Sequence, residues 1–172
     1  MDQDDTKPLE SSPVHGKIRA RRLDNRLGAV YAALHSFWTA RQASSTRQRD
    51  ANTVILHAQG TRSVCQNDTT RSPDDLLNLL LPHGPGGGNN FNRALMAADT
   101  AVFNWWDDDR PPVIIFLSDG IGSAADGIVQ KLFHKAAQKG CVTFDCQDMY
   151  NSKLTFRAAK GSRCTPSCSV LK

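Results

Sequence analysis

The chain has 172 residues, of which 40% are hydrophobic and 22% charged, and its formal net charge is +4. This composition is typical of a globular protein, and the length suits roughly one domain. No segment approaches the ~18 consecutive apolar residues of a membrane helix, and the acidic first residues lack the apolar core of a secretory signal. We therefore expect a cytoplasmic protein that does not contact a membrane.

Basic residues concentrate in two segments, 17–26 and 151–172, each with five lysines or arginines. Neither segment interleaves aromatic side chains with the basic charges, as a nucleic-acid stacking surface would, so we expect solvated segments and no nucleic-acid partner. The five cysteines contain no Cys-x-x-Cys pair and no complete zinc-ligand spacing. Reduced thiols, as in an intracellular protein, are the simpler interpretation.

The first half of the chain begins with residues 1–20, which show no apolar period and are interpreted as a flexible lead-in. Apolar residues at helical spacing then predict a helix over 24–41, with Asp24 or Asn25 as its N-cap. A short β-branched run at 53–56 predicts a buried strand.

A second, weaker strand is expected near 63–65. Ser72 as a cap, Pro73 at the first helical position and the acids that follow predict a short helix that ends at Pro82. A glycine-rich loop, from Gly84 to Asn90, comes next.

The second half begins with a helical period that starts at Phe91 and closes at the tryptophans 105 and 106. The continuous apolar run at 113–117 predicts a strand covered on both faces, which is typical of a central parallel strand. A further helix is predicted over 125–139, with Gly140 as its C-cap, followed by a strand at 141–144.

No dependable period follows Asp148. The alternation of helices and strands predicts an α/β fold, with a three-layer, doubly wound and mostly parallel sheet that carries helices on both faces.

Asp119 directly follows the 113–117 strand, at the edge of such a sheet where ligands bind. A carboxylate there holds a cation or a polar ligand, or it caps the next turn, and the pattern leaves both interpretations open. The glycine-rich loop invites a phosphate, but it lacks the spacing of a dinucleotide fingerprint and the lysine of a P-loop. A small α/β nucleotide- or phosphate-binding enzyme that uses this loop remains the alternative function.

Three segments together resemble the von Willebrand factor type A domain family: residues 26–34, 87–95 (beginning Gly-Gly-Asn-Asn-Phe) and 113–120 (ending Ser-Asp-Gly). The resemblance implies a metal-ion-dependent adhesion site. In that family a divalent cation, usually magnesium, is held by an Asp-x-Ser-x-Ser motif, a threonine after two glycines and an aspartate after a strand. The cation then binds an acidic side chain of a partner protein, and the expected activity is protein–protein recognition without catalysis.

Carried onto this chain, the resemblance assigns Asp119 as a metal ligand and places Asn89 where the family has its threonine, while Ser118 and Gly120 shape the turn. Neither an Asp-x-Ser-x-Ser motif nor an apolar strand precedes the 24–41 helix. We therefore expect that the first central strand of the sheet is missing and that magnesium binds weakly.

The same resemblance bears on the organisation of the chain, because the family often carries a methionine after the last serine of that motif. We interpret Met1 as this methionine and the chain as an N-terminally truncated domain; the alternative is a short variant with a rebuilt sheet. The predicted organisation is a flexible segment at 1–20, a partial domain at 21–148 and a basic, disordered tail at 149–172.

Overall fold

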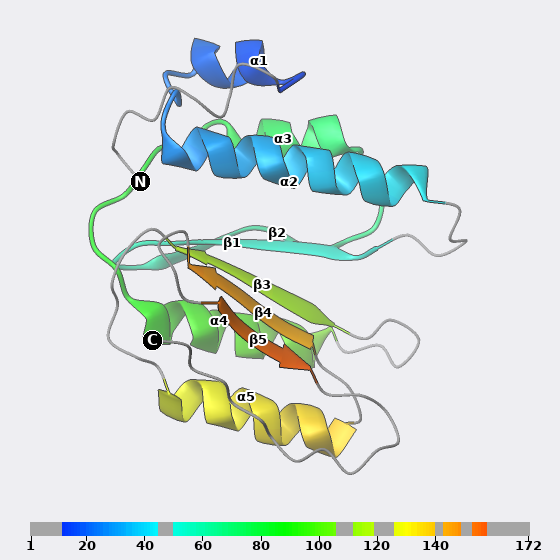
Figure 1. Ribbon diagram of the computed structural model, residues 1–172, viewed down its shortest axis with the longest axis vertical. Coiled ribbons are helices and arrows are strands. Elements are labelled where there is room, and N and C mark those ends of the chain that lie inside the picture. Colours follow the sequence, from blue (N-terminus) through cyan, green and yellow to red (C-terminus); the bar gives the residue numbers. More distant parts are fainter. Residues whose placement is uncertain are drawn as a thin grey trace. The chain divides into compact units, whose positions relative to one another are not determined.

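Helices and strands alternate along the chain in a computed structural model that describes residues 12–44, 50–105, 112–118, 126–139, 143–148 and 153–157 (Figure 1). The mixed α/β class predicted from the sequence is confirmed. By its internal contacts the chain divides into two units. The first comprises Met1–Leu56 and Arg62–Gly87, and the second comprises His57–Thr61 and Gly88–Lys172. Among the helices that the structure describes, none is long and apolar enough to cross a membrane.

The longest helix of the first unit is α2 (Arg26–Ala43), close to the predicted 24–41. Asn25 is its N-cap, since the Asn25 side-chain oxygen accepts a hydrogen bond from the Gly28 amide at 3.1 Å. A Cβ at Gly28 would lie 1.8 Å from the backbone oxygen of Leu23. Only glycine therefore permits the chain before α2 to approach its first turn so closely.

Helix α3 (Pro73–Leu80) begins as the sequence predicts. The Ser72 hydroxyl accepts a hydrogen bond from the Asp75 amide at 3.2 Å, and the Asp75 carboxylate accepts one from the Ser72 amide at 3.3 Å. The segment after α3 is fixed to α2 by Tyr31, whose buried hydroxyl donates to the His83 carbonyl oxygen at 2.9 Å. Burial raises the pKa of Tyr31 to about 12.

A short helix precedes α2, within residues 1–20, which are predicted to be a flexible lead-in. Helix α1 (His15–Ala20) buries Ile18 completely, and Val14 just before it is almost as buried. Six residues contribute too few apolar side chains for a period to be visible in the sequence. Residues 1–11 lie outside the described part of the chain. The core of this unit consists of Val14, Ile18, Leu23, Leu27, Tyr31, Ala32, Trp38, Cys65, Leu76, Leu77, Leu80 and Leu81.

Strands β1 (Asn52–His57) and β2 (Thr61–Asp68) pair as a two-stranded sheet. The connection is only three residues long, so the strands form an antiparallel hairpin. Both strands are longer than the predicted 53–56 and 63–65.

Asp68 ends β2 and organises the turn that leads to α3. Its Oδ1 accepts hydrogen bonds from the Thr70 amide at 2.9 Å, the Thr70 hydroxyl at 3.1 Å and the Arg71 amide at 3.0 Å. The Arg71 guanidinium pairs with Oδ2. Burial raises the pKa of Asp68, but these hydrogen bonds lower it by more, to about 2.

The second unit contains a three-stranded sheet of order β3-β4-β5, with β3 (Val113–Ser118) parallel to β4 (Thr143–Asp148). Strand β5 (Lys153–Arg157) pairs antiparallel with β4, in a segment where the sequence shows no period. The helices are α4 (Phe91–Asn104) and α5 (Asp126–Lys139), both as predicted. Trp105 is the C-cap of α4, whereas Trp106 and Gly140 lie outside the described residues.

Helices α4 and α5 and strand β3 share the core of this unit, which is centred on Leu95, Ile114 and Leu132. Phe116 and Ile128 are among the partly buried side chains packed against it.

The predicted single doubly wound sheet is not seen among the described residues, which form two separate sheets. Strand β3 was predicted to be central, but it is the edge of its sheet as described. Its Val113 and Ile115 side chains are 59% and 47% exposed, whereas Ile114 is 9% exposed. A continuous apolar run therefore marks a strand here without showing that both of its faces are covered.

Asp68→Asn is expected to lower the free energy of unfolding near neutral pH by about 1–2 kcal/mol, because the amide loses the charge-assisted hydrogen bonds. The pKa of Asp68 is depressed from 3.8 to about 2 in the folded chain, so its stabilisation is present above about pH 4 and is lost as the pH falls through 2. Urea unfolding measured across this range should show a shallower acid dependence for the variant. Identical pH dependence of stability in the variant and the unmodified chain would show that Asp68 does not contribute to the acid sensitivity of the fold.

Ile115→Thr and Ile114→Thr are expected to differ sharply, although they change neighbouring residues of β3 in the same way. Ile114 lies in the core, and a buried hydroxyl in its place should lower the free energy of unfolding by about 2 kcal/mol. Ile115 is half exposed, so its replacement should leave stability within about 0.5 kcal/mol and reduce aggregation. Denaturant unfolding measures the change in stability and light scattering measures aggregation. Equal destabilisation by the two substitutions would contradict the difference in burial between Ile114 and Ile115.

Candidate functional site

The loop before α4 is the first part of the candidate site. Asn90 is the N-cap of α4: its side-chain oxygen accepts a hydrogen bond from the Arg93 amide at 3.0 Å. The Asn90 amide donates to the Ala58 carbonyl oxygen at 3.0 Å, which holds the loop against the turn between β1 and β2. The capping bond occupies one of the amides that a phosphate would bind at this helix end.

Asn89 precedes this cap and is exposed. Among the described residues, no hydrogen bond engages its side chain. Asn90 therefore has a structural role, while the Asn89 amide oxygen is accessible to a ligand.

Gly88 permits the close approach of this loop to the β1–β2 turn. Its φ is +83°, a conformation that side chains other than glycine rarely adopt, and a Cβ would lie 2.2 Å from the Gln59 side chain. At Gly87, by contrast, a Cβ would meet nothing within 4 Å. The close approach therefore requires a glycine at position 88 but not at position 87.

His57 connects this turn to the end of β3. Its Nε2 lies 3.3 Å from the Leu117 carbonyl oxygen, and its ring stacks on Phe116 with a centroid separation of 5.0 Å. Phe91, the first residue of α4, packs edge-on against Phe116 at 5.2 Å and lies 6.1 Å from the His57 ring. One aromatic cluster therefore joins three segments: the end of β1, the start of α4 and the end of β3.

The end of β3 is the second part of the candidate site. Ser118, the last residue of the strand, is buried. Asp119 and Gly120, which the resemblance assigns to the next turn, lie outside the described residues. The structure thus ties the loop that carries Asn89 and the strand that leads to Asp119 to the same cluster of His57, Phe91 and Phe116.

The donor atoms that the structure describes here do not by themselves fit magnesium. Magnesium prefers oxygen ligands, usually including a carboxylate, and Asn89 offers one neutral amide oxygen. The buried His57 Nδ1 has no hydrogen-bond partner in the described part of the chain, but an imidazole nitrogen is a poor ligand for this ion. Within the same residues, no group of three or more His, Cys, Asp or Glu side chains is placed to hold a metal ion.

His57 was not predicted as a functional residue. The five histidines share no metal-ligand spacing, and the role of this one depends on contacts with residues far along the chain. Its place at the end of a predicted strand, where ligands collect in α/β folds, is the signal that was available.

Comparisons with protein-family models, with curated proteins and with solved structures found no match to this chain.

Gly88→Ala and Gly87→Ala form a matched pair for the geometry of this loop. Gly88→Ala is expected to lower the free energy of unfolding by about 1–3 kcal/mol, because it strains a left-handed residue and displaces Gln59. Gly87→Ala should change stability by less than about 0.5 kcal/mol. Denaturant unfolding of both variants is the measurement, and an equal effect would contradict the close approach at Gly88.

Proposed function

We propose that this chain is a non-catalytic protein–protein interaction domain of the von Willebrand factor A type, with an incomplete metal-ion-dependent adhesion site. The observation that carries the proposal is the aromatic cluster around His57. It ties the glycine-rich loop to the end of β3, and these are two of the three segments on which the resemblance rests.

The site that we propose uses Asp119 as the metal ligand and Asn89 as the second ligand. Asn89 supports this assignment because its side chain is exposed and unengaged within the described residues, next to an asparagine that is fixed as a helix cap. A bound magnesium ion would supply the positive charge that attracts an acidic side chain of the partner protein. The chain's own residues would position that ion at the carboxyl end of β3.

The finer fold that we propose is the three-layer, doubly wound sheet without its first central strand. The open edge of β3 supports this proposal, because this strand, with its apolar run at 113–117, pairs on one side only among the described residues. An additional strand along that edge would satisfy backbone groups that an edge strand leaves unpaired.

The alternative, a phosphate- or nucleotide-binding enzyme that uses the loop from Gly84 to Asn90, receives less support. The side chain of Asn90 already occupies an amide at the start of α4. Arg93 lies in the first turn of α4, but its backbone amide donates to the Asn90 cap.

The chain is expected to bind magnesium or manganese no more tightly than about 1 mM, because a single carboxylate and a neutral amide do not replace the hydration shell of the ion. Fusing a strand that ends in Asp-x-Ser-x-Ser ahead of Met1 should raise the affinity at least about tenfold. Asp119→Ala should abolish this gain, and Asn89→Thr, which restores the family's hydroxyl, should preserve or increase it. Calorimetric titration measures each affinity.

Asp74→Ala is the control for this experiment, since it removes an exposed carboxylate from the first unit and should leave the gain intact. Micromolar manganese binding by the unmodified chain that survives Asp119→Ala would show that the site is misplaced. Stabilisation of the chain by ATP or inorganic phosphate would favour the enzyme instead.

A further inference from the structure

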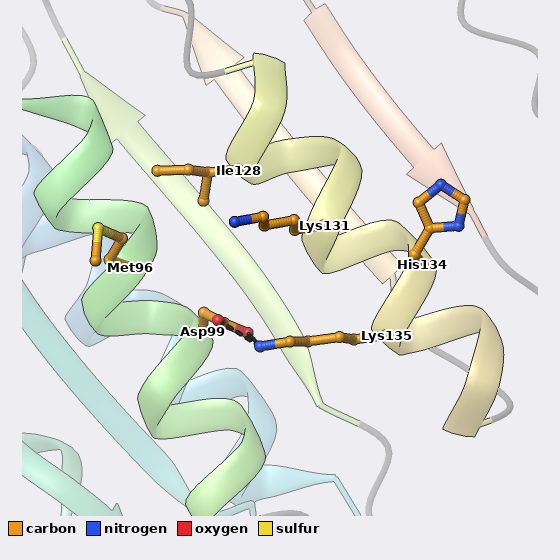
Figure 2. Close-up of a pocket in the computed structure, with 6 residues that line it drawn as sticks. All are labelled: Met96, Asp99, Ile128, Lys131, His134 and Lys135. Atoms are coloured by element: carbon orange, nitrogen blue, oxygen red, sulfur yellow. Dashed lines mark hydrogen bonds and ion pairs between the residues drawn. The ribbon is translucent and has the colours of Figure 1, made fainter.

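A groove of about 570 Å³ lies between α4 and α5 in the second unit, and neither Asn89 nor Asp119 is among its lining residues (Figure 2). Its size is within the range of ligand sites in proteins. The two helices that form the groove also share a core that contains Leu95 and Leu132, so their packing is part of the fold. The groove is lined by Met96, Asp99, Ile128, Lys131, His134 and Lys135.

Positive charge predominates around the groove, where two lysines face one carboxylate. Figure 2 shows Lys131 and Lys135 extending from α5 toward α4. Lys135 is fixed, since its Nζ lies 2.7 Å from Asp99 Oδ2 and 4.8 Å from the centre of the Phe103 ring. Lys131 makes no ion pair within the described residues, which leaves one uncompensated charge at the rim.

The rest of the groove is apolar and adaptable. Met96 on α4 is 58% exposed, and Ile128 on α5 is only partly buried. Methionine is flexible and fits partners of different shape. An apolar surface next to an unpaired cation is complementary to a segment that carries both apolar and acidic side chains.

We propose that this groove binds an acidic, amphipathic segment of a partner protein. An Asp or Glu side chain of the segment pairs with Lys131, and an apolar side chain covers Met96 and Ile128. Nucleic acid fits less well, because Lys131 is a single unpaired cation among the described lining residues and the apolar Met96 and Ile128 offer nothing to a phosphate backbone. The proposal does not depend on the metal site.

The test uses the full chain and a fluorescein-labelled peptide of sequence Leu-Glu-Glu-Leu-Leu-Glu-Glu-Leu, with fluorescence anisotropy as the readout. Lys131→Glu is expected to weaken binding at least about fivefold, and Met96→Ser at least about threefold. Asp99→Asn should strengthen binding about threefold, because it releases Lys135 and removes a negative charge. A role of Asp99 in stability alone would not produce this gain.

Arg62→Glu is the matched control, since it reverses an exposed charge on β2 in the first unit. It should leave peptide affinity unchanged within about twofold. No binding of the peptide, an equal loss with Arg62→Glu, or an affinity insensitive to both Met96→Ser and Asp99→Asn would overturn the proposal. Tighter binding of a single-stranded oligonucleotide that Lys131→Glu abolishes would overturn it in favour of nucleic acid.

Discussion

The stacking of His57 on Phe116, together with its contact to the Leu117 carbonyl oxygen, is the interaction on which the candidate site depends. His57 ends β1 and, with the turn that follows it, belongs to the second unit, whereas most of β1 and β2 belongs to the first. Its contacts with Phe116 and Leu117 are made within the second unit. The close approach at Gly88 and the bond from the Asn90 amide to Ala58 use the same turn. Without the imidazole, the glycine-rich loop and the end of β3 would lose their shared support.

The buried Nδ1 of His57 has no hydrogen-bond partner among the described residues, and a buried polar atom left unpaired lowers the stability of the fold. A phenylalanine would stack equally well on Phe116 but would give the Leu117 carbonyl no donor. The position therefore combines an aromatic face with a polar edge, and histidine is a residue that offers both.

Helices α2 to α5 could be predicted from the sequence because their signals are local, whereas the six-residue α1 was not predicted. Asn25 and Ser72 cap α2 and α3 through bonds to amides three residues ahead, and the apolar period lies within each helix. The edge position of β3 and the pairing of β5 depend on which strands meet in space. No window of sequence contains that information, and an apolar strand looks the same at the edge and in the centre.

For the candidate site, the sequence predicted the loop and the strand end but not the contacts that hold them together. Asn89 and Asp119 were assigned by resemblance to a motif, and this assignment remains a prediction. His57 was not found, because its partner Leu117 lies 60 residues further along the chain. The groove between α4 and α5 could not be anticipated either, since Met96 and Lys131 become neighbours only when the two helices pack.

The placement of His57–Thr61 in the second unit has a consequence for how the chain can be divided. The chain passes from the first unit to the second at His57, returns to the first at Arg62, and passes to the second again at Gly88. Neither unit is therefore an uninterrupted stretch of sequence. A fragment starting at Gly88 would contain α4, α5, Phe91 and Phe116 but not the His57 ring that stacks on Phe116, so it would keep both helices and lose the anchor of the glycine-rich loop.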